Sequence, residues 1–343
     1  ANFMHHLLAD GAPCEAVMRE YRIGGKRIDL VLSAVQHDGA WTPCASPTMA
    51  FEFKGGAYNT RNALHDVIAA DGHCPYLDKL AALRSEGLEC WFVCSDMAEL
   101  GIALSPWAQL QVAKQCARRG IHFAYHAQGQ DRLLIARAGR PLQRPKLQAT
   151  APAVASHARW QDSLPLLAAM LSQSSFTEDT ATGVVYHALQ RSGFNARQVS
   201  LETYFKCARA RGRMQDRPDI CVFGNRVDGR FNLYRGGDPA RSNDGIKIGN
   251  LQALIEIKGS DGTARTSERS FAALVSADID KLRLWRARFE VSGYLPAQAA
   301  ARPDYVMIAV DNRKVPLSSS LLQDLAFQAG QQAVDFHYLR IAP

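Results

Sequence analysis

The sequence predicts an α/β protein of two domains, each a mixed β-sheet flanked by helices. The chain has 343 residues, and at roughly 100 to 200 residues per domain this length suggests two domains. Apolar runs such as residues 89–96 and 304–312 are too continuous to alternate, which is typical of strands covered by helices on both faces. The same order of strands, helix and charged motif occurs in both halves, which indicates an internal duplication.

The individual elements follow from the apolar patterns and the turn residues between them. In the first half we expect strands over residues 16–23, 27–32, 49–56 and 89–96, and a helix over 65–87. In the second half we expect strands over residues 217–224, 251–260 and 304–312, and a helix over 277–289. A Pro- and Ala-rich stretch between the halves lacks an apolar period and is typical of a linker. The predicted organisation is a first domain over 1–140, a linker over 141–160, and a second domain over 161–343 with an insertion at about 224–250.

Composition limits the classes of protein that this chain can belong to. Hydrophobic residues make up 47% and charged residues 21%, a globular mixture rather than a disordered one. No apolar stretch approaches the roughly 18 to 20 residues that cross a bilayer, and the start lacks the layout of a secretory signal, so we expect a cytoplasmic protein without a membrane partner. The eight cysteines form no C-x-x-C pair and are expected to be reduced. The net charge of +7 is compatible with a polyanionic partner.

A pattern of charged residues inside two apolar strands carries the chemistry. Residues two apart in a strand share a face, so Glu52 lies beside Lys54 and Glu256 beside Lys258. Such charges cost several kcal/mol in a buried strand unless they are paired or coordinate an ion. An aspartate lies in the strand before each pair, which a hairpin would place alongside. The candidate catalytic residues are therefore Asp29, Glu52, Lys54, Asp219, Glu256 and Lys258.

Two carboxylates with room for water and a substrate phosphate describe a typical Mg²⁺ site, and Mn²⁺ would suit the same ligands. Such a metal lowers the pKa of bound water and neutralises charge that grows on a phosphoryl oxygen. The nearby lysine would orient the attacking water, help to deprotonate it, or stabilise the transition state. The sequence leaves these three roles open.

Asp29 with Glu52-Phe53-Lys54, and Pro218-Asp219 with Glu256-Ile257-Lys258, resemble the PD-(D/E)XK nuclease superfamily. The resemblance covers most of the chain as two tandem copies, and it departs from the pattern at Ile28, where a proline would stand. It implies the restriction-endonuclease-like fold, a mixed sheet flanked by helices, and divalent-metal-dependent phosphodiester hydrolysis. It also implies metal ligation by Asp29, Glu52, Asp219 and Glu256, with Lys54 and Lys258 beside the nucleophilic water.

Further residues have a functional and a structural interpretation. Some members of the superfamily add a carboxylate from a helix, for which Glu15, Glu20 and Glu178 are candidates. Lys79 and Lys281 follow on amphipathic helices, where a lysine either approaches phosphate or, more commonly, lies in solvent. A basic cluster before the second aspartate strand would track a nucleic-acid backbone or form a solvated surface. Its members are Arg209, Arg211, Arg213 and Arg217.

These expectations add up to a DNA endonuclease that uses Mg²⁺ or Mn²⁺. One site of this kind hydrolyses one strand, so two sites in one chain would cut both strands, for instance in restriction or defence. One alternative is a nuclease-fold subunit that binds DNA or acts as a scaffold without turnover, and another is a toxin or effector that targets nucleic acid. No phosphate-binding NTPase loop occurs in the sequence, so any ATP-driven translocation would need a partner subunit.

Overall fold

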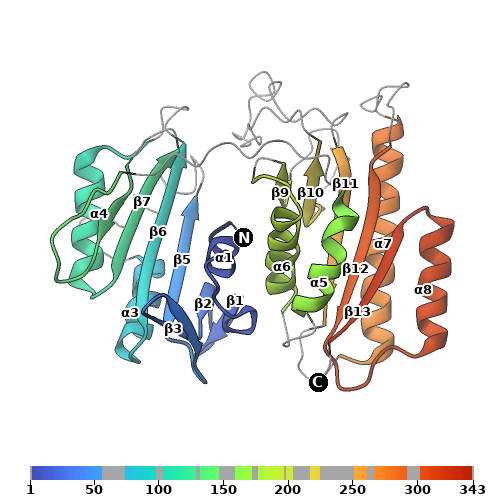
Figure 1. Ribbon diagram of the computed structural model, residues 1–343, viewed down its shortest axis with the longest axis horizontal. Coiled ribbons are helices and arrows are strands. Elements are labelled where there is room, and N and C mark those ends of the chain that lie inside the picture. Colours follow the sequence, from blue (N-terminus) through green and yellow to red (C-terminus); the bar gives the residue numbers. More distant parts are fainter. Residues whose placement is uncertain are drawn as a thin grey trace. The chain divides into compact units, whose positions relative to one another are not determined.

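A computed structural model shows two compact units (Figure 1). The structure describes residues 2–55, 74–97, 103–128, 132–146, 159–171, 177–196, 198–203, 217–224, 251–260, 266–291 and 302–341. The N-terminal unit is Gly11–Pro152, and the C-terminal unit combines Ala1–Asp10 with Ala153–Pro343. The first ten residues therefore belong to the C-terminal unit, where helix α1 (Asn2–Ala9) packs against helix α6 (Glu178–Arg191). Most of the expected linker and of the expected insertion lies outside the described residues.

The N-terminal unit is built on a six-stranded mixed sheet in the order β1-β2-β5-β6-β7-β8. Its strands are β1 (Val17–Ile23), β2 (Lys26–Leu32), β5 (Met49–Gly55), β6 (Glu89–Met97), β7 (His122–Gln128) and β8 (Leu134–Ala136). Strands β5, β6 and β7 are parallel to one another, whereas β1–β2, β2–β5 and β7–β8 are antiparallel pairs. A separate hairpin joins β3 (Ala34–His37) to β4 (Ala40–Pro43), and a 3₁₀ turn, η1 (Cys14–Ala16), precedes β1.

The C-terminal unit has a five-stranded mixed sheet in the order β13-β12-β11-β10-β9. Its strands are β9 (Val199–Leu201), β10 (Ile220–Phe223), β11 (Leu251–Gly259), β12 (Asp304–Asp311) and β13 (Asp335–Arg340). Strands β9, β10 and β11 form antiparallel neighbours, and β11, β12 and β13 are parallel. The directions and order therefore repeat those of β1, β2, β5, β6 and β7, so the duplication expected from the sequence extends to the topology.

The helices also repeat, but they cover the two sheets differently. In the N-terminal unit, α3 (Pro75–Ser85) and α4 (Pro106–Arg118) pack into one hydrophobic core on one face of the sheet. In the C-terminal unit, α7 (Glu268–Val291) and α8 (Ser319–Gln331) occupy the corresponding face. Helices α6 and α5 (Leu164–Leu171) lie toward the other face, as Figure 1 shows, and the 3₁₀ turn η3 (Trp160–Ser163) contacts both of them.

The burial of the central strands differs accordingly. In β12 every residue after Asp304 is buried, as expected for a strand between two helical layers. In β6 burial alternates, with Phe92 and Cys94 buried while Trp91 and Val93 remain partly accessible. The expectation that residues 89–96 are covered on both faces is therefore wrong, because both helices of this core pack on the same face of the sheet.

A hydrogen-bonded aspartate–tyrosine pair joins corresponding strands in the two units, β6 to β7 and β12 to β13. The Tyr125 hydroxyl donates to Asp96 Oδ2 at 3.0 Å and accepts from the Leu104 N–H at 2.8 Å, next to the start of α4. In the C-terminal unit, the Tyr338 hydroxyl donates to Asp311 Oδ2 at 2.7 Å and accepts from the Leu317 N–H at 3.2 Å, next to the start of α8. Because the same bonds join corresponding strands and helices, the duplication includes individual polar contacts.

Of the helices that the structure describes, none has the length and apolar character needed to cross a membrane.

Candidate active site

The sheet register places the motif aspartates beside the Glu-x-Lys strands. In the N-terminal unit, Leu30 of β2 pairs with Phe51 of β5, so Asp29 comes next to Glu52 along the antiparallel ladder. The Phe53 N–H donates to Asp29 Oδ2 at 2.7 Å. In the C-terminal unit, Asp219 immediately precedes β10, and its Oδ2 accepts from the Ile257 N–H, also at 2.7 Å.

In the N-terminal pocket, Glu52 holds two lysines. The Glu52 side chain is 2% exposed; its Oε1 accepts from Lys54 Nζ at 2.9 Å and its Oε2 from Lys79 Nζ at 2.6 Å. Lys79 extends from α3 and also donates to the Arg27 carbonyl at 2.7 Å. Lys54 Nζ lies 3.9 Å from the centre of the Tyr76 ring, a cation–π contact. Burial favours neutral Lys54, but the adjacent Glu52 and Asp29 outweigh it and raise the lysine pKa.

In the C-terminal pocket, Lys281 repeats the contacts of Lys79. It extends from α7, lies 2.9 Å from both carboxylate oxygens of Glu256, and donates a hydrogen bond to Oε2. It also donates to the Arg217 carbonyl at 2.9 Å, the position that corresponds to Arg27. A helical lysine therefore ties the motif glutamate to the chain just before the motif aspartate in both units.

The strand lysine has different partners in the C-terminal pocket. Lys258 Nζ lies 3.0 Å from Glu178 Oε2 and 3.2 Å from Asp278 Oδ2. Glu178 is the first residue of α6, and its carboxylate also accepts from the Gly259 N–H at 3.3 Å. A Cβ on Gly259 would lie 2.7 Å from the backbone of Glu178, so only glycine allows α6 to approach β11 this closely.

One helix position explains most of the difference between the two pockets. Asp278 lies three residues before Lys281, and Tyr76 lies three residues before Lys79, so both occupy the same place on corresponding helices. Each contacts the strand lysine of its own unit, Asp278 through an ion pair and Tyr76 through its ring. The C-terminal pocket thereby has a carboxylate where the N-terminal pocket has a phenol.

Burial perturbs the acids of the C-terminal pocket strongly. Desolvation raises the pKa of Asp219 to about 6, although the Ile257 N–H and Lys281 oppose the shift. Burial and the nearby Asp219 also raise the pKa of Glu256 well above its ordinary value. For Lys258, burial lowers the pKa, but the carboxylates of Glu178 and Asp278 outweigh it and raise the pKa. Lys258 is therefore an ammonium ion at neutral pH, whereas Asp219 and Glu256 are costly to ionise.

We expect Asp219→Asn to stabilise the metal-free protein at neutral pH. The unfolded aspartate ionises near pH 3.8 and the folded one near pH 6, so the folded state loses stability as the pH rises between these values and carries the full penalty above them. Removing this penalty is worth on the order of 1 to 3 kcal/mol. Calorimetric unfolding in EDTA at pH 7.5 should show a higher Tm for the variant, and this difference should shrink at pH 5. A destabilised variant at pH 7.5 would contradict the raised pKa of Asp219.

The structure brings most of the predicted site residues into these two pockets. Of the three helical carboxylate candidates, Glu178 contacts Lys258, whereas Glu15 is exposed in η1 and Glu20 pairs with Arg27. The exposed Arg217 is 3.5 Å from Glu202. Arg209, Arg211 and Arg213 lie outside the described residues.

Sequence reasoning missed three residues of these pockets and undervalued two. Lys79 and Lys281 were expected mainly in solvent, but each bonds to a buried glutamate; their signal was the repeated Asp-Lys-Leu of residues 78–80 and 280–282. Tyr76 and Asp278 were missed because they differ in chemistry, so the duplication did not mark them. Gly259 was also missed, because its role depends on the approach of α6.

The donor set fits a hard divalent cation that keeps several waters. Among the described residues, no group of three or more His, Cys, Asp or Glu side chains is arranged so that it could hold a metal ion. Mg²⁺ is commonly held by only one or two carboxylates, with water and phosphate completing the shell. In the C-terminal pocket, Glu256 Oε1 and Asp278 Oδ2 are buried oxygens whose partners among the described residues are ammonium groups, Lys281 Nζ at 2.9 Å and Lys258 Nζ at 3.2 Å. Such oxygens favour a cation, so the acids present in this pocket suit Mg²⁺ or Mn²⁺.

Comparison with known proteins gives no independent assignment. No family model matches the sequence, and neither a curated protein nor a solved structure matches it.

Proposed function

We propose that the protein is a divalent-metal-dependent nuclease that hydrolyses phosphodiester bonds in DNA. The observation that supports this most is the repetition of one polar arrangement in two units. In each unit an aspartate accepts from the backbone after a buried glutamate, and a helical lysine bonds to that glutamate. One such arrangement in a single unit could be an ion pair that only stabilises the fold. Two copies of it, one in each unit, are better explained by selection for a shared chemistry.

Asp219 and Glu256 are the proposed metal ligands in the C-terminal unit, as Asp29 and Glu52 are in the N-terminal unit. When bound, Mg²⁺ or Mn²⁺ supplies a more acidic water and neutralises charge on the phosphoryl oxygens. The Ile257 N–H holds Asp219 in place through its Oδ2. Lys281 fixes the Glu256 side chain through its Oε2. These contacts preorganise the two carboxylates, which lowers the cost of assembling the site.

Lys258 is proposed to donate hydrogen bonds to a phosphoryl oxygen or to the attacking water. Glu178 and Asp278 keep it positively charged, because they raise its pKa. An ammonium group that stays protonated at neutral pH is a poor general base, so of the three roles open from the sequence, this environment favours positioning and transition-state stabilisation.

The net charge of +7 and the chemistry of the pockets support a nucleic acid as the substrate, and DNA is the class that we propose. An alternative for the N-terminal unit is binding without turnover. This alternative is favoured by Glu52, whose two oxygens are already occupied by Lys54 and Lys79. That unit would then contact the phosphate backbone while the other unit carries out hydrolysis.

The test is digestion of supercoiled plasmid by the full chain. We expect conversion to open-circular or linear DNA in Mg²⁺ or Mn²⁺, and no conversion in EDTA, because the carboxylates alone do not activate water. Linear single-stranded DNA and RNA in parallel reactions identify the substrate class. Absence of metal-dependent cleavage of all three substrates would overturn the proposal, and equal cleavage in EDTA would overturn the role of the metal.

A further inference from the structure

The two pockets repeat the same backbone contacts but differ in their balance of charge. The N-terminal pocket contains Asp29 and Glu52 as acids and Lys54 and Lys79 as bases. The C-terminal pocket contains the acids Asp219, Glu256, Glu178 and Asp278 and the bases Lys258 and Lys281. Among the residues that the structure describes, acids and bases therefore balance in the first set, and acids exceed bases in the second.

The N-terminal pocket already neutralises its buried glutamate. Lys54 and Lys79 each occupy a different carboxylate oxygen of Glu52, at 2.9 and 2.6 Å. A divalent ion that binds Glu52 would therefore compete with two ammonium groups for a side chain that is 2% exposed. Separating a buried ion pair costs several kcal/mol, and this cost is subtracted from the affinity for the metal.

In the C-terminal pocket a single lysine, Lys281, lies 2.9 Å from both oxygens of Glu256. Glu178 and Asp278 draw Lys258 away from Glu256, which keeps only Lys281 as a hydrogen-bond donor among the described residues. The Glu256 side chain is 2% exposed. One ammonium group neutralises a buried carboxylate less fully than two do, so a divalent ion relieves more of the burial cost at Glu256 than at Glu52.

This difference is built into the backbone and the helices. Gly259 permits the close approach of α6 that brings Glu178 to Lys258. At the corresponding glycine of β5, Gly55, a Cβ would meet no atom closer than 3.8 Å. Asp278 adds the second acid at the helix position that Tyr76 occupies in the other unit. The two acids act together on Lys258, so Glu256 is left with Lys281 as its one lysine partner among the described residues.

We infer that the C-terminal pocket binds the divalent ion and that the charge-balanced N-terminal pocket does not, with Glu178 and Asp278 acting as positioning residues that keep Lys258 off Glu256. This inference rests on the proposed nuclease function and adds a division of labour between the two units. It implies that one chain has one hydrolytic site and nicks a single strand, so a double-strand break needs a second chain.

Calorimetric titration of the full, metal-stripped chain with Mn²⁺ tests the inference. We expect one ion per chain, and loss of that binding in Glu256→Gln. We expect Asp278→Asn to weaken binding by about 10- to 100-fold, the usual effect of removing a group that positions a metal ligand. Asp324→Asn, at an exposed position of α8, is the matched control for a lost acid and should bind like the wild type.

The outcomes separate this inference from the proposed function. Two ions in the wild type, or binding that is lost in Glu52→Gln and kept in Glu256→Gln, would overturn the division of labour and leave metal-dependent hydrolysis standing. Absence of any Mn²⁺ binding would overturn both. Near-ultraviolet circular dichroism of each variant identifies loss of folding. If Glu256→Gln does not fold, the Mn²⁺ affinity of Asp278→Asn decides: an affinity equal to that of Asp324→Asn would overturn the inference.

Discussion

Lys258→Met is expected to lower the rate of Mg²⁺-dependent plasmid cleavage by about 10²- to 10³-fold, the usual effect of removing one donor that stabilises transition-state charge. Lys258 is 19% exposed and is held by Glu178 and Asp278, so its ammonium group is both oriented and kept charged. Methionine retains the length of the side chain but loses the charge. The rate is measured from the loss of supercoiled plasmid over time.

The matched control for this substitution is Lys314→Met, which removes an exposed lysine from the same unit. We expect its cleavage rate to stay within about twofold of the wild type, because a single exposed charge contributes little. Lys258→Arg should restore part of the lost activity if charge is the requirement. A Lys258→Met enzyme as fast as Lys314→Met would show that this lysine has no part in hydrolysis.

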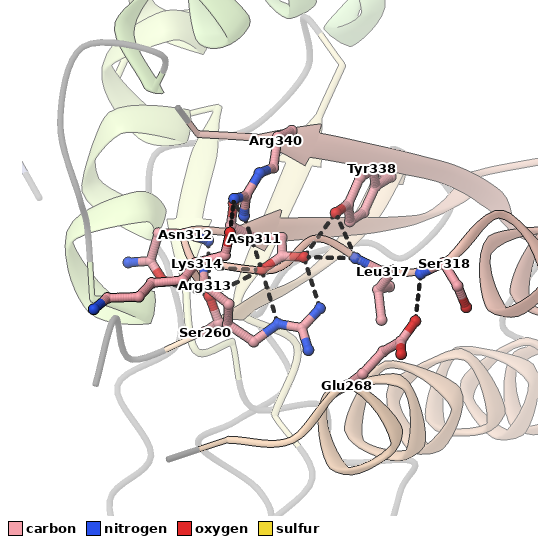
Figure 2. Close-up of polar contacts among 10 residues, drawn as sticks. All are labelled: Ser260, Glu268, Asp311, Asn312, Arg313, Lys314, Leu317, Ser318, Tyr338 and Arg340. Carbon is pink, nitrogen blue, oxygen red and sulfur yellow. Dashed lines mark hydrogen bonds and ion pairs between the residues drawn. The ribbon is translucent and has the colours of Figure 1, made fainter. Parts of the chain in front are cut away.

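Asp311→Ala is expected to destabilise the C-terminal unit by about 3 to 5 kcal/mol. Asp311 is fully buried at the end of β12, and its carboxylate accepts from the Arg313 guanidinium at 2.8 and 2.9 Å (Figure 2). Figure 2 also shows the Tyr338 hydroxyl and Arg340 directed at Asp311. Alanine would leave Arg313, which is 6% exposed, as an unpaired buried charge.

Calorimetric unfolding of the full chain measures this effect as a lower Tm of one transition. The comparison variant Tyr338→Phe removes the hydrogen bond to Asp311 and the one from the Leu317 N–H. It leaves Arg313 paired and leaves the Leu317 N–H bonded to Asp311, so we expect a loss of about 1 to 2 kcal/mol. If Asp311→Ala lowers the free energy of unfolding by no more than Tyr338→Phe does, the buried Asp311–Arg313 ion pair does not stabilise this end of the sheet.

Strand periodicity was enough to predict which charged residues share a face. Glu52 and Lys54 lie two apart on β5, and their side chains meet at 2.9 Å. The same periodicity on β11 does not give the partner of Lys258, which contacts Glu178 and Asp278 instead. Partner choice depends on α6 and α7, whose approach no local pattern encodes.

The internal duplication predicted the arrangement of the strands better than it predicted how the helices pack on the sheets. The order and directions of five strands repeat between the units, as the repeated motifs indicated. Helix α1 lies early in the sequence but packs on α6, and this pairing is a long-range contact that apolar spacing cannot show. Likewise, the apolar run of residues 89–96 did not reveal that β6 buries mainly one face, because an apolar side chain is tolerated in a partly exposed position.

The most direct test of the account is the rate at which supercoiled plasmid is lost in Mg²⁺, compared between the wild type and Glu256→Gln. We expect cleavage by the wild type and its loss in the variant, because Glu256 is the proposed metal ligand that only one described lysine, Lys281, contacts. Equal cleavage by the two proteins, or none by the wild type in Mg²⁺ or Mn²⁺, would contradict it.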